Sequence, residues 1–249
     1  MIYTCESHIG KVRKNNEDYC KGEIIDTEFG SIGIFALADG MGGHNKGEVA
    51  SKMAVDNIIV FLKENLLQSN NIKIDYIDDI IKQAYNNVNY MIYEKSISDV
   101  EFEGMGTTLV VAIIYKNNIY IANVGDSRCY LLNNNEFNKV TIDHSVVEEL
   151  VQANIITEKE AKTHPRRNHI TRAVGTDEMV IVDIFKKDIH LNDKILLTSD
   201  GLTGFVDDET IKEILLKNKD INNLARDLIN KANDVSGKDN ISVILIEEK

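Results

Sequence analysis

The chain has 249 residues, of which 43% are hydrophobic, and a formal net charge of -12 from 40 acidic and 28 basic side chains. This hydrophobic content predicts a folded chain with a sizeable core. The acidic excess argues against a nucleic-acid partner, because binding to a phosphate backbone usually needs a basic face. The same acidity is compatible with carboxylates gathered around metal ions, although an acidic surface alone would also produce it.

The three cysteines, Cys5, Cys20 and Cys129, stand at no metal-ligand spacing. An odd and sparse set indicates a reducing compartment and not a disulfide framework. The N-terminal sequence lacks the apolar stretch of a secretory signal. The longest apolar runs, such as Leu109 to Tyr115, are far shorter than the roughly 18 residues that span a bilayer. We therefore expect a cytoplasmic protein with no membrane segment.

Short segments rich in β-branched and aromatic residues predict the strands of the fold. They are 32–38, 108–115, 119–124, 128–132, 180–185, 194–198 and 241–246. Most are almost continuously apolar, as is typical of sheets covered on both faces. No repeat, low-complexity stretch or linker interrupts the chain, and its only proline is Pro165. Residues 1–249 are therefore expected to form one domain.

Apolar residues at helical spacing predict four helices, at 47–67, 76–94, 208–217 and 222–233. The expected buried faces of the first two contain Val49, Met53, Ile58, Phe61 and Leu62, and then Ile77, Ile80, Ile81, Ala84, Val88 and Met91. Strands grouped with strands predict the α+β class, as a four-layer αββα sandwich of two antiparallel sheets flanked by helices. Between residues 143 and 175 the pattern is polar and irregular, with a short helix at most. This stretch predicts a surface flap at about 145–172.

Aspartates stand where the apolar strands end or begin. Asp39, Asp126 and Asp200 follow predicted strands, and Asp239 precedes the last one. An aspartate beside glycine is usually a turn residue, so each is weak alone. Together they favour a metal site, because hard oxygen ligands without His or Cys select Mg²⁺ or Mn²⁺. Two such ions roughly 3.5–4 Å apart can share a bridging water and make it a nucleophile.

Eight short motifs follow one another along nearly the whole chain. They are Arg13-x-x-Asn16-Glu17-Asp18, Asp39-Gly40-Met41-Gly42-Gly43-His44, Gly106-Thr107-Thr108, Val124-Gly125-Asp126-Ser127-Arg128, Asp143-His144-Ser145, the run from His164 to Gly175, Ser199-Asp200-Gly201 and Asp239-Asn240. In this order they resemble the protein phosphatase 2C, or PPM, family of metal-dependent phosphatases in its compact bacterial form.

The resemblance implies a metal-binding role for each acidic motif residue. Asp39 would bridge two central metals, with the carbonyl of Gly40 on the second metal. Asp200 and Asp239 would complete the first metal, and Asp126, with Asp200, matches the position of a third and weaker metal. Glu17 and Asp18 would bind the second metal directly or through its waters. The implied cofactors are two, or three, ions of Mn²⁺ or Mg²⁺.

The resemblance also assigns two catalytic candidates. Arg13 would bind the substrate phosphate, a task that suits a bidentate guanidinium. Without the Asn-Glu-Asp motif beside it, Arg13 would be interpreted as a surface cation. Family relatives from eukaryotes carry a histidine directly after their Asp-Gly, where this chain has Met41. His44 is the substitute candidate for the general acid, and the alternative is that it caps the helix that follows.

The activity that the resemblance implies is hydrolysis of phosphoserine and phosphothreonine on proteins, through a metal-bridging water and without a phosphoenzyme. Lys11, Asp26 and Asn135 lie six residues after the cysteines, where a cysteine phosphatase would need arginine. No Asp-x-Asp pair and no P-loop sequence occurs either. The alternatives are an inactive regulatory binding module and a hydrolase of other phosphomonoesters.

Partners are expected to be phosphoproteins, namely a bacterial Ser/Thr kinase and its targets, and the default state is a monomer. The flap contains Arg166, Arg167 and Arg172 in a chain short of positive charge. They would either steer a phosphopeptide toward the site or only pack and form ion pairs within the loop. We predict that the flap controls substrate access, since loops of this length are often functional.

Overall fold

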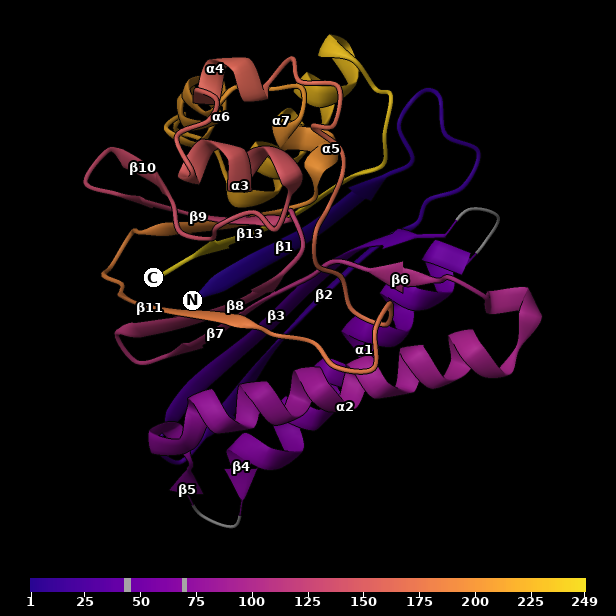
Figure 1. Cartoon of the computed structure of the whole chain (residues 1–249). Helices are drawn as coiled ribbons and strands as arrows, with labels where there is room; N and C mark the ends of the chain where they lie inside the picture. The colour runs from indigo at the N-terminus through magenta and orange to yellow at the C-terminus, as the bar shows by residue number, and fades with distance from the viewer. Residues whose placement is uncertain (43–45, 69–70) are drawn as a thin grey trace.

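The structure is a computed structural model that describes residues 1–42, 46–68 and 71–249 (Figure 1). Two antiparallel sheets pack face to face, and helices cover the outer face of each (Figure 1). This arrangement confirms the predicted four-layer αββα sandwich of the α+β class.

The first sheet has five strands in the order β1-β13-β12-β9-β10. Their bounds are β1 Ile2–His8, β9 Arg128–Asn133, β10 Glu136–Lys139, β12 Lys194–Thr198 and β13 Ile241–Glu247. Strand β1 pairs with β13 from Ile2↔Glu247 to His8↔Ile241, so the first and last strands of the domain lie side by side. Sequence-distant residues that precede or follow these strands are thereby brought to the same end of the sheet.

The second sheet runs in the order β11-β8-β7-β3-β2, and β6 pairs with the end of β3. The bounds are β2 Asp18–Thr27, β3 Gly30–Met41, β6 Gly106–Thr107, β7 Leu109–Tyr115, β8 Asn118–Val124 and β11 Asp183–Asp188. Every residue of β7 is buried, as its continuous apolar sequence predicted. A separate pair of short strands, β4 (Leu67–Gln68) and β5 (Asn71–Ile72), stands outside both sheets.

Helices α1 (Lys46–Leu66) and α2 (Ile77–Ser98) cover the second sheet, and α6 (Asp208–Leu215) and α7 (Ile221–Val235) cover the first (Figure 1). Short helices α3 (Val146–Gln152) and α4 (Glu158–Ala161) belong to the expected flap, and α5 (Asp200–Thr203) follows β12. Two turns of 3₁₀ helix, Ile74–Tyr76 and Val100–Phe102, flank α2.

The buried apolar residues form three clusters, one in each space between adjacent layers. Ala54, Ile58 and Ile81 belong to the cluster under α1 and α2, and Leu224 and Leu228 to the one under α7. A third cluster fills the space between the sheets. Because both sheets are covered on both faces, their central strands are rigid supports for whatever side chains lie at their ends.

Several boundaries differ from the sequence-based expectation. Strands β1 and β2 were not predicted, and the strand expected at 180–185 lies at Asp183–Asp188, three residues later. Met91, expected in the core, is 37% exposed, and Ile92 is buried in its place. Val49, Met53 and Phe61 are only partly buried, because α1 contacts both the sheet and α2 and buries Ala50, Ala54 and Val55 more deeply.

Within residues 1–42, 46–68 and 71–249, no helix combines the length and apolar character that crossing a membrane requires.

Candidate metal centre

Five aspartates from both sheets gather at one end of the sandwich, and we call them the carboxylate cluster. Asp18 opens β2 and lies opposite Asp39 of β3 in the strand register. Asp200 is the first residue of α5, directly after β12, Asp239 lies just before β13, and Asp126 lies in the turn between β8 and β9. The expectation that Asp39, Asp126, Asp200 and Asp239 stand at strand ends therefore holds for the last three, whereas Asp39 lies inside β3, which continues to Met41 to pair with β6.

The pKa values of four of these aspartates are raised by burial and by the negative charges of the neighbouring carboxylates. Burial, followed by the negative charges of Asp18, Asp200, Asp126 and Asp239, raises the pKa of Asp39 well above its usual range. Burial and the Asp200 charge raise the pKa of Asp126 to about 8. Burial also raises the pKa of Asp18 to about 7 and that of Asp200 to about 6. Like charges held together in a poorly solvated place need a cation or protons to balance them.

Two oxygens of the cluster are buried without a hydrogen-bond partner. Among the described residues, nothing donates a hydrogen bond to Asp18 Oδ1 or Asp200 Oδ1, and water does not reach these atoms. The other oxygen of Asp18 accepts from the Ser199 hydroxyl at 2.7 Å. A buried carboxylate oxygen without a partner is energetically costly. A bound cation would provide the missing partner, so these two atoms are suited to serve as its ligands.

Asn240 fixes the loop between β1 and β2 against the start of β13. Its Oδ1 accepts from the Glu17 backbone N–H at 2.8 Å, and its Nδ2 donates to the carbonyls of Ile9 and Asn15 at 2.9 Å each. In the sequence, Asn240 and Ser199 stand out only as neighbours of aspartates in the motifs. Their positions beside Asp239 and Asp200 were the available signal, but the hydrogen bonds cross more than 180 residues and no local pattern reveals them.

Gly40 lies where β3 passes closest to α1. A Cβ at Gly40 would meet the Gly47 carbonyl oxygen at 2.0 Å, so only glycine fits. The Gly40 N–H donates to the Glu17 carbonyl at 3.0 Å, which joins the first and second acidic motifs. His44, the candidate general acid, lies outside the described residues.

Arg13 and Glu17 lie at the open side of the cluster. Arg13 Nη2 donates to Asp239 Oδ2 at 2.8 Å, and the Arg13 side chain is 47% exposed. Burial raises the pKa of Glu17, which the nearby Arg13 charge counteracts. The structure thus brings Arg13, Glu17 and the carboxylate cluster together, as the motifs predicted, although their individual roles stay predictions.

The base of the flap is tied to the turn that contains Asp126. His144 Nδ1 accepts from the Gly125 N–H at 3.0 Å, and its Nε2 lies 3.1 Å from Asp183 Oδ2. Arg172 donates to Asp183 Oδ1 at 2.8 Å and to the Ile181 carbonyl. His144 therefore has a structural role, and Arg172 is engaged in an ion pair at the flap base.

The chemistry of this donor set fits Mg²⁺ or Mn²⁺, since it consists of oxygen atoms, has an excess of negative charge and includes buried oxygens without partners. In the described part of the chain, however, no three His, Cys, Asp or Glu side chains are already arranged as a group that could hold an ion. Carboxylate sites for these ions also use backbone carbonyls and water, so a complete side-chain cage is not required.

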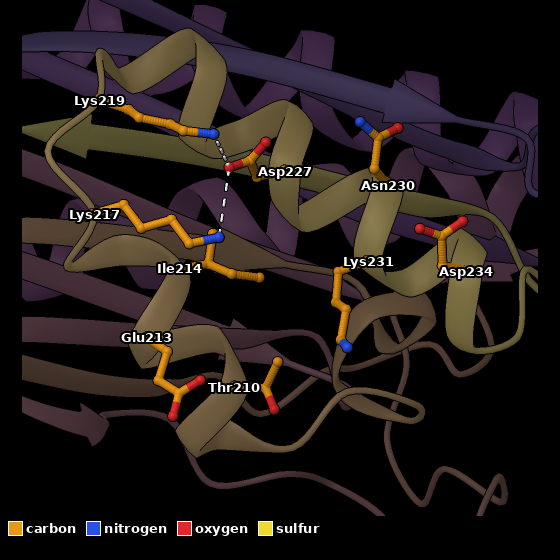
Figure 2. A pocket seen from close by; sticks show the side chains of 9 residues that line it. All are labelled: Thr210, Glu213, Ile214, Lys217, Lys219, Asp227, Asn230, Lys231 and Asp234. Atoms are coloured by element: carbon orange, nitrogen blue, oxygen red, sulfur yellow. Dashed lines mark hydrogen bonds and ion pairs between the residues drawn. The ribbon is translucent and has the colours of Figure 1, made fainter.

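A separate groove of about 400 Å³ lies between α6 and α7 (Figure 2). Figure 2 shows Lys217 and Lys219 turned toward Asp227, with nitrogen–oxygen distances of 3.8 and 2.6 Å. No member of the carboxylate cluster lines this groove. Because its three lysines are matched by Glu213, Asp227 and Asp234, the groove offers little net charge to a ligand.

Comparison with known proteins agrees with this architecture. Residues 6–245 match the family described as Protein phosphatase 2C. The serine/threonine phosphatase stp of Listeria welshimeri is 40% identical over 238 residues, which are 96% of this chain and 92% of that protein. The chain belongs to the protein phosphatase 2C family.

Solved structures of the family have the same fold. The crystal structure of the serine/threonine phosphatase Stp1 from Staphylococcus aureus superposes with a TM-score of 0.89 at 38% identity, covering 99% of this chain and 94% of that one. The catalytic domain of the serine/threonine protein phosphatase PstP, in complex with two manganese ions, superposes with a TM-score of 0.83 at 32% identity and covers 99% and 97% of the two chains.

Proposed function

We propose that this chain hydrolyses phosphoserine and phosphothreonine on proteins, with Mn²⁺ or Mg²⁺ held by the carboxylate cluster. The observation that carries this proposal is the burial of five aspartates together, with Asp18 Oδ1 and Asp200 Oδ1 lacking partners. Its family membership and its similarity to a manganese-bound PstP domain support the same assignment.

The proposed division of the ligands follows the motif positions. Asp39, Asp200 and Asp239 would hold a first ion, and Asp39, the Gly40 carbonyl, Glu17 and Asp18 would hold a second, the last two directly or through its waters. Asp126, together with Asp200, would hold a third. When bound, these ions neutralise phosphate oxygens and acidify water near neutral pH. The fixed positions of the strand ends keep the ligand oxygens in place before the cations arrive.

Arg13 is proposed to bind the substrate phosphate at the mouth of the cluster. Its half-exposed guanidinium is held by Asp239 on one side and leaves further N–H groups directed to solvent. A planar fork of donors matches two oxygens of a phosphate, which orients the phosphorus toward the cluster. His44 stays a prediction for the donor of a proton to the leaving serine or threonine oxygen.

The flap at about 145–172 is proposed to control access of the phosphoprotein. Arg166 and Arg167 are exposed on it, whereas Arg172 is engaged at its base. The tie from His144 to Gly125 links the flap base to the Asp126 turn. We further propose that the substrates are a bacterial Ser/Thr kinase and its targets, that the enzyme is a monomer, and that it works in the cytoplasm, which the three free thiols support.

The test is hydrolysis of a phosphothreonine peptide with Mn²⁺, with Mg²⁺ and with EDTA, by the wild type and by Asp200→Asn. We expect activity only with metal, and a fall of about a hundredfold or more in the variant, because a group that stabilises the transition state is lost. Asp234→Asn, a change of the same chemistry at an exposed site, should keep full activity. A folded wild-type protein with no turnover under any metal would instead indicate a binding module.

A further inference from the structure

Cys5 and Cys20 are brought together across the two sheets, although no cysteine motif predicts it. Cys5 lies on β1 and Cys20 on β2, and these are edge strands of opposite sheets. Both side chains pack against the cluster between the sheets and both are half-buried, whereas Cys129 is fully buried. The pair therefore stands at an open edge of the sandwich, where a small oxidant can reach it.

The alignment of β1 with β2 places the two thiols opposite each other. The Tyr3 hydroxyl donates to the Gly22 carbonyl at 2.7 Å, two residues before Cys5 and two residues after Cys20. Because side chains on one face of a strand recur every second residue, Cys5 and Cys20 form the next pair along this edge. In agreement with this alignment, interaction with the Cys20 thiol lowers the pKa of Cys5, although burial acts in the opposite direction, while the same interaction and burial raise the pKa of Cys20.

The two edges also approach more closely than facing sheets usually do. Sheets pack about 10 Å apart, but Cα atoms of β1 and β2 come within 8 Å of each other. The absence of a side chain at Gly22 permits this, since a Cβ there would lie 2.7 Å from the Tyr3 ring. A disulfide requires Cα atoms roughly 4.4–6.8 Å apart, so its formation would hold β2 against β1 within this range and draw β2 toward β1 from any larger separation.

We propose that Cys5 and Cys20 are a reversible oxidation site, which hydrogen peroxide converts to a disulfide that joins the two sheets. The Cys5 thiol loses its proton and the sulfur attacks one peroxide oxygen; the O–O bond breaks, Cys5 sulfenic acid forms, and the leaving hydroxide takes up that proton as water. The Cys20 sulfur then attacks the Cys5 sulfur, an S–S bond forms, and the hydroxyl leaves with the thiol proton as a second water. Two thiols lose two electrons in total, and the peroxide is reduced to two waters.

The disulfide would act on the carboxylate cluster through β2. Asp18 lies two residues from Cys20 on the same face of β2, and its position depends on the Ser199 hydroxyl bond. Movement of β2 toward β1 would displace Asp18 from Ser199 and from Asp39. This regulatory consequence rests on the proposed function, whereas formation of the disulfide does not.

The test treats the reduced full-length protein with hydrogen peroxide, denatures it, and labels the remaining thiols with N-ethylmaleimide for intact mass and peptide mapping. We expect one labelled thiol, Cys129, and a tryptic peptide 1–11 linked to peptide 15–21 that dithiothreitol separates. Cys129→Ala should form the same link, whereas Cys5→Ser and Cys20→Ser should not. Three labelled thiols, a link that includes Cys129, or oxidation of Cys5 to sulfinic acid without a link would overturn the proposal.

Activity on the phosphothreonine peptide tests the regulatory consequence separately. We expect the oxidised wild type to lose about tenfold or more of its activity, comparable to disturbing a supporting group of a metal site. Dithiothreitol should restore it, and Cys20→Ser should stay active under peroxide. A linked protein with unchanged activity would refute the regulation and leave the oxidation site standing. A reduced wild type without activity would refute the proposed function, while the mass readout would still decide the oxidation site.

Discussion

Arg13 is positioned by a contact that contributes little to the fold. Its ion pair with Asp239 is well formed at 2.8 Å, yet the Arg13 side chain is 47% exposed. Exposed ion pairs contribute roughly 0–1 kcal/mol to stability, because solvent screens them and the side chains lose entropy. Its place beside the carboxylate cluster is therefore better explained by binding of a phosphate than by stabilisation of the loop.

Arg13→Lys tests this role, because lysine keeps the charge and loses the planar fork. We expect kcat/KM for a phosphothreonine peptide to fall about ten- to a hundredfold, since a hydrogen bond to a charged group is worth about 1.5–3 kcal/mol. The melting temperature should stay unchanged. Arg226→Lys, at an exposed arginine that pairs with Glu6, is the matched control. Equal kcat/KM for the wild type and Arg13→Lys would remove Arg13 from the site.

The aspartates of the site were easier to predict from the sequence than the residues that hold them in position. Asp39, Asp126 and Asp200 were recognisable because a carboxylate beside glycine at the end of an apolar run is a local feature. Asn240 and Ser199 were not assigned, because their partners, Glu17 and Asp18, lie far away along the chain. Their hydrogen bonds exist only after β1 and β13 pair and bring the two ends of the domain together.

Among the elements, the flap is anchored by backbone contacts at its base. Ser145 and Ile170 form an isolated bridge, and the Thr171 N–H donates to the His144 carbonyl at 2.8 Å. The helices α3 and α4 between them bury no residue completely. The flap therefore lies outside the sandwich and contributes little to the three apolar clusters.

Replacing residues 147–168 by a short glycine linker should leave the sandwich folded. We expect activity on a phosphoprotein to fall by about tenfold or more, because a wide contact surface is lost, while hydrolysis of a small phosphomonoester changes much less. Far-ultraviolet circular dichroism controls for folding. An unchanged rate on the phosphoprotein would end the proposal that the flap controls access.

The predictability of the strands depended on where they lie in the sheets. The central strands β7, β8 and β12 are apolar on both faces, and their bounds were predicted within a residue. The edge strands β1 and β2 were missed because polar and charged residues such as Glu6, Lys21 and Glu23 break up their apolar runs. Strand β11 was placed three residues early, since Met179 and Ile181 are apolar yet 81% and 72% exposed.

For the whole molecule, electrostatic repulsion within the carboxylate cluster makes the free energy of unfolding depend on pH. Asp18, Asp126 and Asp200 have pKa values of about 7, 8 and 6 in the fold without metal, against roughly 4 for an unfolded aspartate. Between about pH 4 and 8 the folded chain therefore binds more protons than the unfolded chain. The free energy of unfolding accordingly decreases as pH rises through this window.

The metal-free protein should consequently melt at a higher temperature at pH 5.5 than at pH 8, by about 3 °C or more, since 1 kcal/mol shifts the midpoint of a chain of this size by roughly 2–4 °C. Added Mn²⁺ should raise the melting temperature more at pH 8, where the ligands are ionised, than at pH 5.5. Differential scanning calorimetry with and without EDTA measures both. A metal-free protein that is more stable at pH 8 would contradict the repulsion inferred for the cluster.

The buried aspartates are proposed to form a divalent-metal centre. Measurement of Mn²⁺ binding to the protein tests this most directly. Isothermal titration calorimetry of the EDTA-treated and dialysed wild type should show at least about two ions per chain. Asp39→Asn, which alters the proposed shared ligand, should lose measurable binding of both, while Asp234→Asn binds as the wild type does. Wild-type stoichiometry and affinity in Asp39→Asn, with the protein folded, would contradict the claim.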